Sequence, residues 1–208
     1  MAPHTFKLTY FDFRGRGEPI RIILNYVKQP FLDNRIQRDQ WPSIKPTTPF
    51  GQIPVLEVDG IEIAQTVAIM RFIGRSFALA GKDNIEAAQL DAIADTFKDF
   101  QSEMFEYFLV AIGFKEGNKE ALYKEKMVPA VEKHFPVFDR ILSKAGSGFF
   151  GRSGISWVDF FIADFLTTVM KYGSDSLVNK YSHMKSFYER VHSLPPLKQY
   201  FKNRKDTF

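Results

Sequence analysis

Strand-like patterns are confined to the first 78 residues of this 208-residue chain. In that stretch, short runs in which apolar and polar residues alternate are interleaved with helical spacing and turn residues. Beyond residues 80–84 no strand pattern follows, and apolar residues recur every three or four positions. The sequence therefore predicts an α+β chain of two domains: an α/β domain over residues 1–79, a linker over 80–85 and an all-helical domain over 86–208.

The order of elements in the first domain is predicted to be βαβ followed by ββα. Asp59 and Gly60 stand between two short apolar runs, which is the strongest local signal for a β-hairpin. The expected elements are a strand over 5–10, a helix over 20–27, a weak strand over 31–36, a hairpin over 55–64 and a helix over 67–73.

The second domain is predicted to contain only helices. One covers 90–101, and a second covers 128–142, with Pro129 and Pro136 bending or interrupting it. A third opens at Ser156, where Asp159 three residues later completes an acidic capping box. Two further helices fit 176–192 and 196–204.

Composition narrows the possible functions. Cysteine is absent, which excludes disulfides, cysteine-ligated metals and a cysteine nucleophile, and which fits a reducing compartment. The net charge of +4 comes from interspersed charges, so no nucleic-acid footprint is expected. The segment Met1–Lys7 is too polar for a signal peptide, and the apolar stretch Phe160–Met170 is too short to span a membrane. Twenty-two phenylalanines require a large core, and some can line an apolar cavity.

Known catalytic and metal-binding motifs are missing. No phosphate-binding loop, zinc motif or nucleophile elbow is present. The four histidines are scattered at positions 4, 134, 183 and 192, which argues against a metal site.

A tyrosine ends the first predicted strand, just before a loop rich in arginine and glycine. Tyr10 leads into Arg14-Gly15-Arg16-Gly17, and the edge of a sheet beside a helix start is where α/β folds bind ligands. The hydroxyl could donate a hydrogen bond to an anion there. The alternative is a strand-end tyrosine whose hydroxyl meets water, and the residues alone favour that alternative.

Two further segments of the first domain are candidates for ligand contact. A cis bond between Ile53 and Pro54 would present the Ile53 backbone to a peptide-like ligand, whereas base rates favour an ordinary trans bond. Gln65 and Thr66 stand at a helix start, which suits a carboxylate, with a plain helix cap as an equal alternative.

Taken in order, these segments resemble the glutathione S-transferase family. The stretches LTYFDFRGRGEPIR, RIQRDQWPSIKPTTPFGQIPVLEVDG and AQTVAIMRFIGR are similar to the sigma class, and to its nematode branch in particular. In the helical half, LDAIADTFKDF and ISWVDFFIADF are similar to two helices of the family. The likeness covers nearly the whole chain.

The resemblance implies a thioredoxin-like first domain, a helical second domain, a cytoplasmic homodimer, and conjugation of the glutathione thiolate to hydrophobic electrophiles in detoxification. Glutathione would be a co-substrate, with no resident cofactor and no metal. Tyr10 would activate the thiol, with positive potential from Arg16. The implied glutathione contacts are Tyr10, Arg16, Trp41, Lys45, Gly51, Gln52, Ile53, Pro54, Gln65, Thr66 and, from the partner subunit, Asp99.

The expected site for the hydrophobic substrate comprises Phe11, Phe13, Gly15, Gln101, Phe105 and Phe208. Plain core packing is the alternative for each phenylalanine, and it is the favoured one for Phe105. Lys98 and Glu106 depart from the prostaglandin-isomerase members of the class, in which an acidic cluster and a tryptophan stand there. A prostaglandin-type isomerase, a non-catalytic carrier of haem or other hydrophobic ligands, and a scaffold without turnover remain alternatives.

Overall fold

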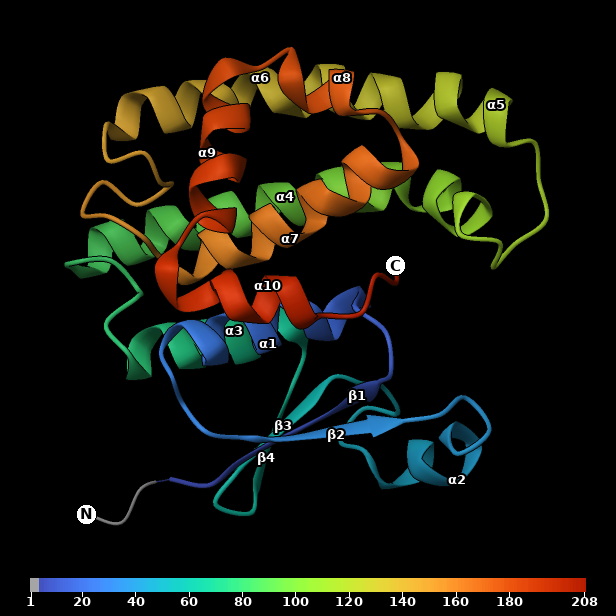
Figure 1. Cartoon of the computed structure of the whole chain (residues 1–208), viewed down its shortest axis with the longest axis vertical. Coiled ribbons are helices and arrows are strands. Elements are labelled where there is room, and N and C mark those ends of the chain that lie inside the picture. The colour runs from blue at the N-terminus through green and yellow to red at the C-terminus, as the bar shows by residue number, and fades with distance from the viewer. Residues whose placement is uncertain (1–3) are drawn as a thin grey trace. The chain divides into compact units, whose positions relative to one another are not determined.

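The computed structural model describes residues 4–208. Residues 1–3, with which the predicted first domain and the polar N-terminal segment begin, lie outside the described residues. The chain forms two compact units, and Figure 1 colours them by residue number. The first unit comprises the residues up to Leu79 together with Leu194–Phe208, and the second comprises Ala80–Ser193.

A four-stranded sheet in the order β2-β1-β3-β4 forms the centre of the first unit. β1 pairs with β2 in parallel, whereas β3 is antiparallel to both β1 and β4. The Asp59-Gly60 turn joins β3 to β4, so the predicted hairpin and the βαβ-ββα order are confirmed. This is the predicted thioredoxin-like arrangement. The strands are β1 (Phe6–Phe11), β2 (Leu32–Ile36), β3 (Val55–Val58) and β4 (Ile61–Ala64).

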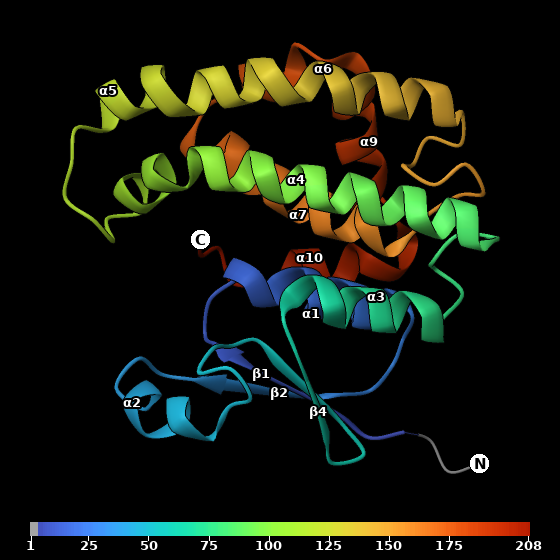
Figure 2. The same cartoon turned by 180° about the vertical axis from the view of Figure 1, so that it is seen from behind.

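Helices α1 and α3 lie side by side on one face of this sheet, as Figures 1 and 2 show. Leu8 and Tyr10 are buried on β1, and Ile20, Ile23 and Ile73 are buried on the helices. The alternation in the strand and the helical spacing therefore converge on one core. The helical segments of the unit are η1 (Gly15–Gly17), α1 (Glu18–Tyr26), α2 (Trp41–Ile44), η2 (Lys45–Thr47), α3 (Thr66–Ser76), η4 (Pro195–Leu197) and α10 (Lys198–Asn203).

The last fifteen residues pack with the first unit, although the predicted helical domain over 86–208 includes them. The Tyr200 hydroxyl donates to the Glu18 carboxylate at 2.8 Å, and the Lys205 ammonium lies 2.6 Å from the Asp12 carboxylate. These contacts join residues more than 180 positions apart, so the order of elements along the chain gives no sign of them. The predicted linker also ends early, because α4 begins at Asn84.

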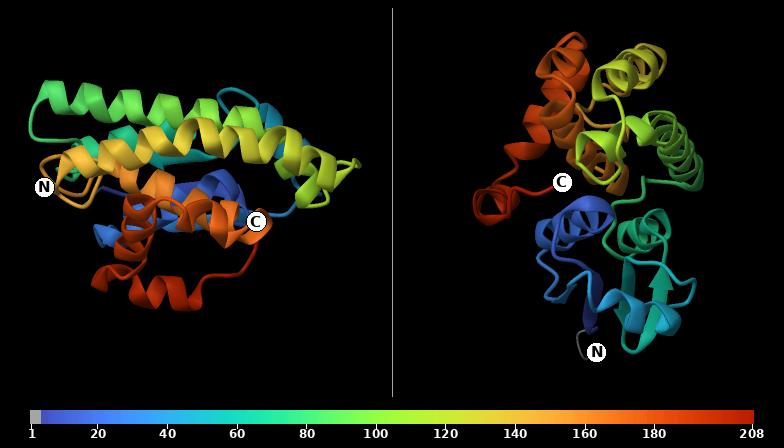
Figure 3. Two further views of the ribbon diagram at one scale, coloured as in Figure 1. Left: turned by 90° about the horizontal axis from the view of Figure 1, so that it is seen from above. Right: turned by 90° about the vertical axis from the view of Figure 1, so that its right-hand side faces the viewer.

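The regular elements of the second unit are all helices, apart from an isolated bridge between Gly151 and Gly154. α4 contacts both α6 and α7, and Figure 3 shows α4 and α6 running alongside one another. Phe97 lies at the centre of the core, with Phe138 and Phe161 at ring-centroid distances of 5.6 and 5.5 Å. The helical segments are α4 (Asn84–Ala111), α5 (Lys119–Leu122), the π-turn η3 (Tyr123–Met127), α6 (Val128–Ala145), α7 (Trp157–Tyr172), α8 (Asp175–Asn179) and α9 (Ser182–His192).

Two helix predictions in this unit need correction. α6 continues unbroken through Pro136, and Pro129 lies in its first turn, where no backbone donor is needed. The single helix expected over 176–192 is two helices. Asp139 of α6 accepts hydrogen bonds from the backbone N–H groups of His183 and Met184, at 2.8 and 3.1 Å, and so caps the start of α9.

The predicted capping box at the start of α7 is present, between Ser156 and Asp159. Across residues 4–208, each helix is either too short or too polar to cross a lipid bilayer.

Candidate active site

Tyr10 lies one residue before the end of β1, and its side chain is only 5% exposed. The loop that follows folds back over the ring, and the backbone N–H of Arg16 donates to the Tyr10 hydroxyl at 3.0 Å. Glycines permit this approach. A Cβ on Gly17 would lie 2.5 Å from Tyr10 Cδ1, and Gly15 has φ of +43° with its would-be Cβ 2.7 Å from the hydroxyl.

Burial raises the pKa of Tyr10 above its ordinary value. The Arg16 N–H and the charges of Arg16 and Arg21 act in the opposite direction but do not outweigh burial. The phenol therefore keeps its proton at neutral pH. The Tyr10 oxygen accepts from the Arg16 N–H, and among residues 4–208 no hydrogen bond engages the Tyr10 proton, so the hydroxyl retains a proton that it can donate.

The start of α3 is tied to the same loop. The Thr66 hydroxyl donates to the Arg16 carbonyl at 3.2 Å, so Tyr10, Arg16 and Thr66 form one cluster. The side chain of Arg16 is exposed, and its hydrogen bonds to Tyr10 and Thr66 use its backbone N–H and carbonyl. Gln65, just before α3, has φ of +72° and donates through Nε2 to the Gln52 side chain at 3.2 Å.

The segment before β3 forms the next part of the site. The Ile53–Pro54 bond is cis, the candidate arrangement that would present the Ile53 backbone, and not the trans bond that base rates favour. Within residues 4–208 no hydrogen bond engages the Ile53 backbone, which leaves its N–H and C=O available to an extended ligand. Lys45 lies beside Gly51, since a Cβ on that glycine would lie 3.6 Å from Lys45 Cε.

Aromatic rings surround the end of β1. Phe11 and Phe13 stack at 5.2 Å with an interplanar angle of 17°, and Trp41 meets Phe11 edge-on at 5.8 Å. The Phe208 ring lies 4.5 Å from Phe13, and the Gly15 N–H donates to the Phe208 carbonyl at 2.8 Å. Four of the six residues predicted for the hydrophobic substrate are thus neighbours in the first unit.

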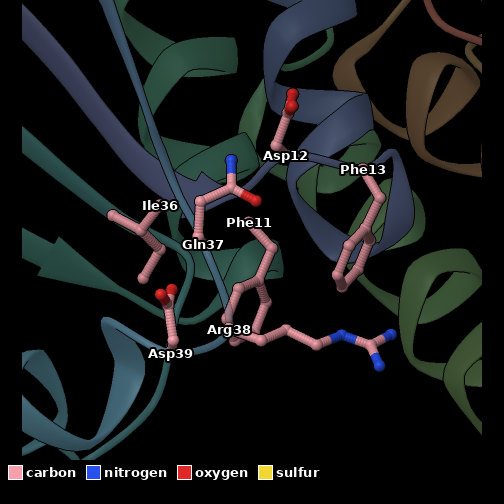
Figure 4. A pocket seen from close by; sticks show the side chains of 7 residues that line it. All are labelled: Phe11, Asp12, Phe13, Ile36, Gln37, Arg38 and Asp39. Atoms are coloured by element: carbon pink, nitrogen blue, oxygen red, sulfur yellow. The ribbon is translucent and has the colours of Figure 1, made fainter.

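A pocket of about 490 Å³ opens beside these rings, beyond the ends of β1 and β2 (Figure 4). In the close view, the Phe11 and Phe13 rings and the Arg38 side chain lie close to one another, while the Asp12 carboxylate points away from them. Both apolar and charged groups are therefore available to a ligand. The lining residues are Phe11, Asp12, Phe13, Ile36, Gln37, Arg38 and Asp39.

The remaining predicted residues lie on α4 of the second unit. Asp99 is exposed and Gln101 is half-buried. Phe105 is 45% exposed, so the interpretation of Phe105 as core packing is wrong. Lys98 pairs with Asp95 at 3.7 Å, and Glu106 pairs with Lys115 at 2.7 Å. Over residues 4–208, no group of three histidine or acidic side chains is arranged to hold a metal ion.

Sequence reasoning missed the buried Arg21, which holds the backbone around the site. Its guanidinium donates to the carbonyls of Phe11 and Phe13, at 3.1 and 2.8 Å, and it pairs with Asp33 at 3.1 Å. The available signal was a charged residue inside the apolar run Ile20–Leu24, three positions after Glu18. A buried charge requires partners, and these carbonyls and carboxylates supply them.

Comparison with known proteins is consistent across the chain. Residues 6–75 match the family "Glutathione S-transferase, N-terminal domain", and residues 98–204 match "Glutathione S-transferase, C-terminal domain". By sequence, Leu194–Arg204 thus belong to the C-terminal domain, although they pack in the first unit. Glutathione S-transferase 1 of Ascaris suum is 45% identical, over 97% of this chain and 98% of the relative.

Solved structures agree with the sequence relatives. The glutathione S-transferase of Ascaris lumbricoides aligns with a TM-score of 0.93 and 43% identity, covering 98% of each chain. Na-GST-3 of Necator americanus, described as monomeric, aligns at 0.92 and 39%, again over 98% of each chain. Prostaglandin synthase D of Nilaparvata lugens aligns at 0.86 and 38%, covering 97% of this chain and 99% of that one. The predicted fold and the predicted relationship are confirmed, and the chain belongs to the glutathione S-transferase family.

Proposed function

We propose that this protein conjugates the thiolate of glutathione to hydrophobic electrophiles, with Tyr10 as the activating group. The observation that carries the proposal is the buried Tyr10 hydroxyl, oriented by the Arg16 N–H at 3.0 Å and kept protonated by its raised pKa. A phenol in this state is a hydrogen-bond donor rather than a base.

The chemistry follows from that state. A free thiol has a pKa near 8.5, so thiolate is scarce at neutral pH. A hydrogen bond from Tyr10 to the sulfur stabilises the anion, with help from the charges of Arg16 and Arg21, and lowers the pKa of the thiol. The thiolate electron pair then forms a C–S bond with the electrophilic carbon, and the leaving group departs with its own electron pair.

The residues around Tyr10 suit the three parts of glutathione. Lys45 would pair with the glycine carboxylate, while the free backbone groups of Ile53 would pair with the cysteinyl unit. Gln65 and Thr66, at the start of α3, would bind the γ-glutamyl carboxylate. Trp41 would form a rigid wall. Gly51, Gln52 and Pro54 complete the proposed contacts.

The electrophile would bind next to the rings at the end of β1. Phe11, Phe13, Gly15 and Phe208 are neighbours there, and the 490 Å³ pocket begins at Phe11 and Phe13. Gln101 and the exposed Phe105 are the proposed contributions from α4.

Three further expectations belong to this proposal. The protein would act as a homodimer, in which Asp99 of the partner subunit meets the γ-glutamyl amine. It would need no metal or resident cofactor. It would be located in the cytoplasm, a reducing compartment, and its lack of cysteine is compatible with that location.

The prostaglandin-isomerase alternative has weaker support. Lys98 stands among the carboxylates of α4 and pairs with Asp95, and Glu106 is engaged by Lys115. Carriage of haem or another hydrophobic ligand can coexist with conjugation, and competition between such a ligand and turnover tests it.

The central test is Tyr10→Phe, assayed with glutathione and 1-chloro-2,4-dinitrobenzene. Loss of one preorganised donor should lower turnover about 10²-fold and leave the glutathione KM and the fold nearly unchanged. Tyr181→Phe, a half-buried tyrosine of the second unit, is the matched control and should retain activity. A Tyr10→Phe enzyme with wild-type kcat/KM across neutral pH would show that Tyr10 is not the activator.

A further inference from the structure

The C-terminal residues form hydrogen bonds at both ends of the loop that follows Tyr10. We call Tyr200–Phe208 the C-terminal strap. At one end of the loop, Lys205 donates to Asp12 at 2.6 Å. At the other end, the Tyr200 hydroxyl donates to Glu18 at 2.8 Å. The Glu18 carboxylate is buried, so that second contact is sheltered from water.

The strap also bonds the middle of the loop. Thr207 Oγ accepts from the Arg14 N–H, and the Phe208 carbonyl accepts from the Gly15 N–H, both at 2.8 Å. The Phe208 ring packs on Phe13 at 4.5 Å. Two consecutive backbone donors are therefore held by the strap, and the next one along the chain is the Arg16 N–H.

That third donor is the one that reaches Tyr10. The loop approaches the hydroxyl so closely that even a Cβ at Gly15 would lie 2.7 Å from it. Small movements of residues 14 and 15 must change the 3.0 Å bond between the Arg16 N–H and the Tyr10 oxygen, because peptide geometry couples adjacent N–H groups.

We propose that the C-terminal strap is a positioning element for thiol activation: it fixes the Arg14–Arg16 backbone so that the Arg16 N–H orients the Tyr10 hydroxyl. The proposal rests on the proposed function, since it assigns to the strap an effect on the thiol that Tyr10 activates. The strap residues act through the loop. They are positioning residues rather than catalytic ones.

The test compares three variants with wild type: Thr207→Val, a chain that ends at Arg204, and Lys202→Ala. Thr207→Val removes one acceptor at nearly constant shape, and the shortened chain removes both acceptors for Arg14 and Gly15. Lys202→Ala is the control, because Lys202 is an exposed residue of the same segment. The main readout is the pKa of the bound glutathione thiol, followed by the ultraviolet absorbance of the thiolate against pH without electrophile.

The pKa of the bound thiol should rise in Thr207→Val and rise further in the shortened chain. The kcat at neutral pH should fall about 10-fold in the shortened chain, less than in Tyr10→Phe because the hydroxyl remains. The glutathione KM should change less than threefold, and Lys202→Ala should match wild type. In a Tyr10→Phe background, shortening the chain should have no further effect on the thiol pKa.

Each result decides one question. If Tyr10→Phe raises the thiol pKa but neither strap variant does, the strap proposal is overturned and the proposed function stands. If Tyr10→Phe itself leaves the thiol pKa unchanged, the role of Tyr10 fails and the strap proposal fails with it. If the shortened chain does not fold, the Thr207→Val variant tests the proposal alone. A bound thiol whose pKa in this variant equals the wild-type value would then overturn the strap proposal.

Discussion

At the scale of single residues, the site depends on two glycines that hold the loop against Tyr10. The sequence predicts Tyr10 and the Arg14–Gly17 loop as neighbours because they are adjacent in the chain. It gives no sign that Gly17 lies against the ring, or that the Arg16 backbone N–H reaches the Tyr10 hydroxyl, because both facts depend on how the loop folds back. The roles of Gly17 and Arg16 therefore depend on tertiary contacts that the local sequence does not reveal.

Gly17→Ala should therefore damage both stability and activity. The new Cβ would lie 2.5 to 2.9 Å from Cδ1, Cγ and Cβ of the buried Tyr10 side chain, so the ring or the loop would have to shift. We expect a loss of about 1–3 kcal/mol in the free energy of unfolding, the range for overpacking a core. Turnover should also fall, because the hydroxyl is displaced.

Urea denaturation and the conjugation assay measure the two effects of Gly17→Ala. Glu116→Ala is the control, because Glu116 is an exposed residue of the second unit. It should stay within about 0.5 kcal/mol of wild type. A Gly17→Ala protein with the wild-type urea midpoint and wild-type turnover would mean that the ring accommodates the methyl group.

At the scale of elements, the sequence predicted most accurately the turns and helix caps that are formed by residues close together in the chain. The hairpin turn at Asp59-Gly60 and the capping box at Ser156 involve residues within three positions of each other, and both are present. The predicted helix over 176–192 failed because Asp139, some forty residues earlier, caps a new helix at His183. A distant cap leaves no periodic signal in the sequence.

The buried carboxylate of Asp159 should make stability depend on pH. Burial raises its pKa to about 6, although Phe150 N–H and the N–H and hydroxyl of Ser156 donate to it. Its unfolded pKa is about 3.9. The folded state thus holds the proton more tightly, so this stabilising contribution is complete below pH 4 and is lost as the pH rises through 6.

Comparison with Asp159→Asn isolates that contribution. The wild-type free energy of unfolding minus that of the variant should fall by roughly 2–3 kcal/mol between pH 4 and pH 7. Urea denaturation at a series of pH values measures this difference. An equal difference at pH 4 and pH 7 would show that Asp159 does not titrate in the folded state over this range.

The carboxylates of α4 should not make activity depend on divalent ions. Asp95 and Asp99 lie four residues apart, hence on one side of the helix, but Lys98 pairs with Asp95 at 3.7 Å and repels a cation. Turnover with EDTA should equal turnover with added Mg²⁺. A several-fold response of wild type to Mg²⁺ would contradict this expectation.

At the scale of the whole molecule, the order of elements along the chain predicted the fold class but not the path of the C-terminus. The switch from strand patterns to helical spacing falls near the boundary between Leu79 and Ala80. The return of Leu194–Phe208 to the first unit depends on single long-range pairs, such as Tyr200 with Glu18. Family resemblance supplied the site residues in the first unit, and physical reasoning from the residues alone favoured less specific roles for Tyr10.

Assembly is the property of the whole molecule on which the proposed site most depends. If Asp99 of the partner subunit binds the γ-glutamyl amine, Asp99→Ala should raise the glutathione KM far more than it lowers kcat, because ground-state binding is lost. The expected loss is about 1–3 kcal/mol, the range for a hydrogen bond to a charged group. Asp95→Ala, also exposed and one turn earlier, is the matched control and should leave the KM unchanged.

Sedimentation separates the partner's role from a role within one chain. A homodimer would sediment at twice the 24.0 kDa of the chain, and dilution into monomers should raise the glutathione KM of wild type but not of Asp99→Ala. The comparison matters because a relative with 39% identity is described as monomeric. A fully active monomer whose KM still depends on Asp99 would assign this carboxylate to its own subunit, whereas an unchanged KM in Asp99→Ala would remove it from the site altogether.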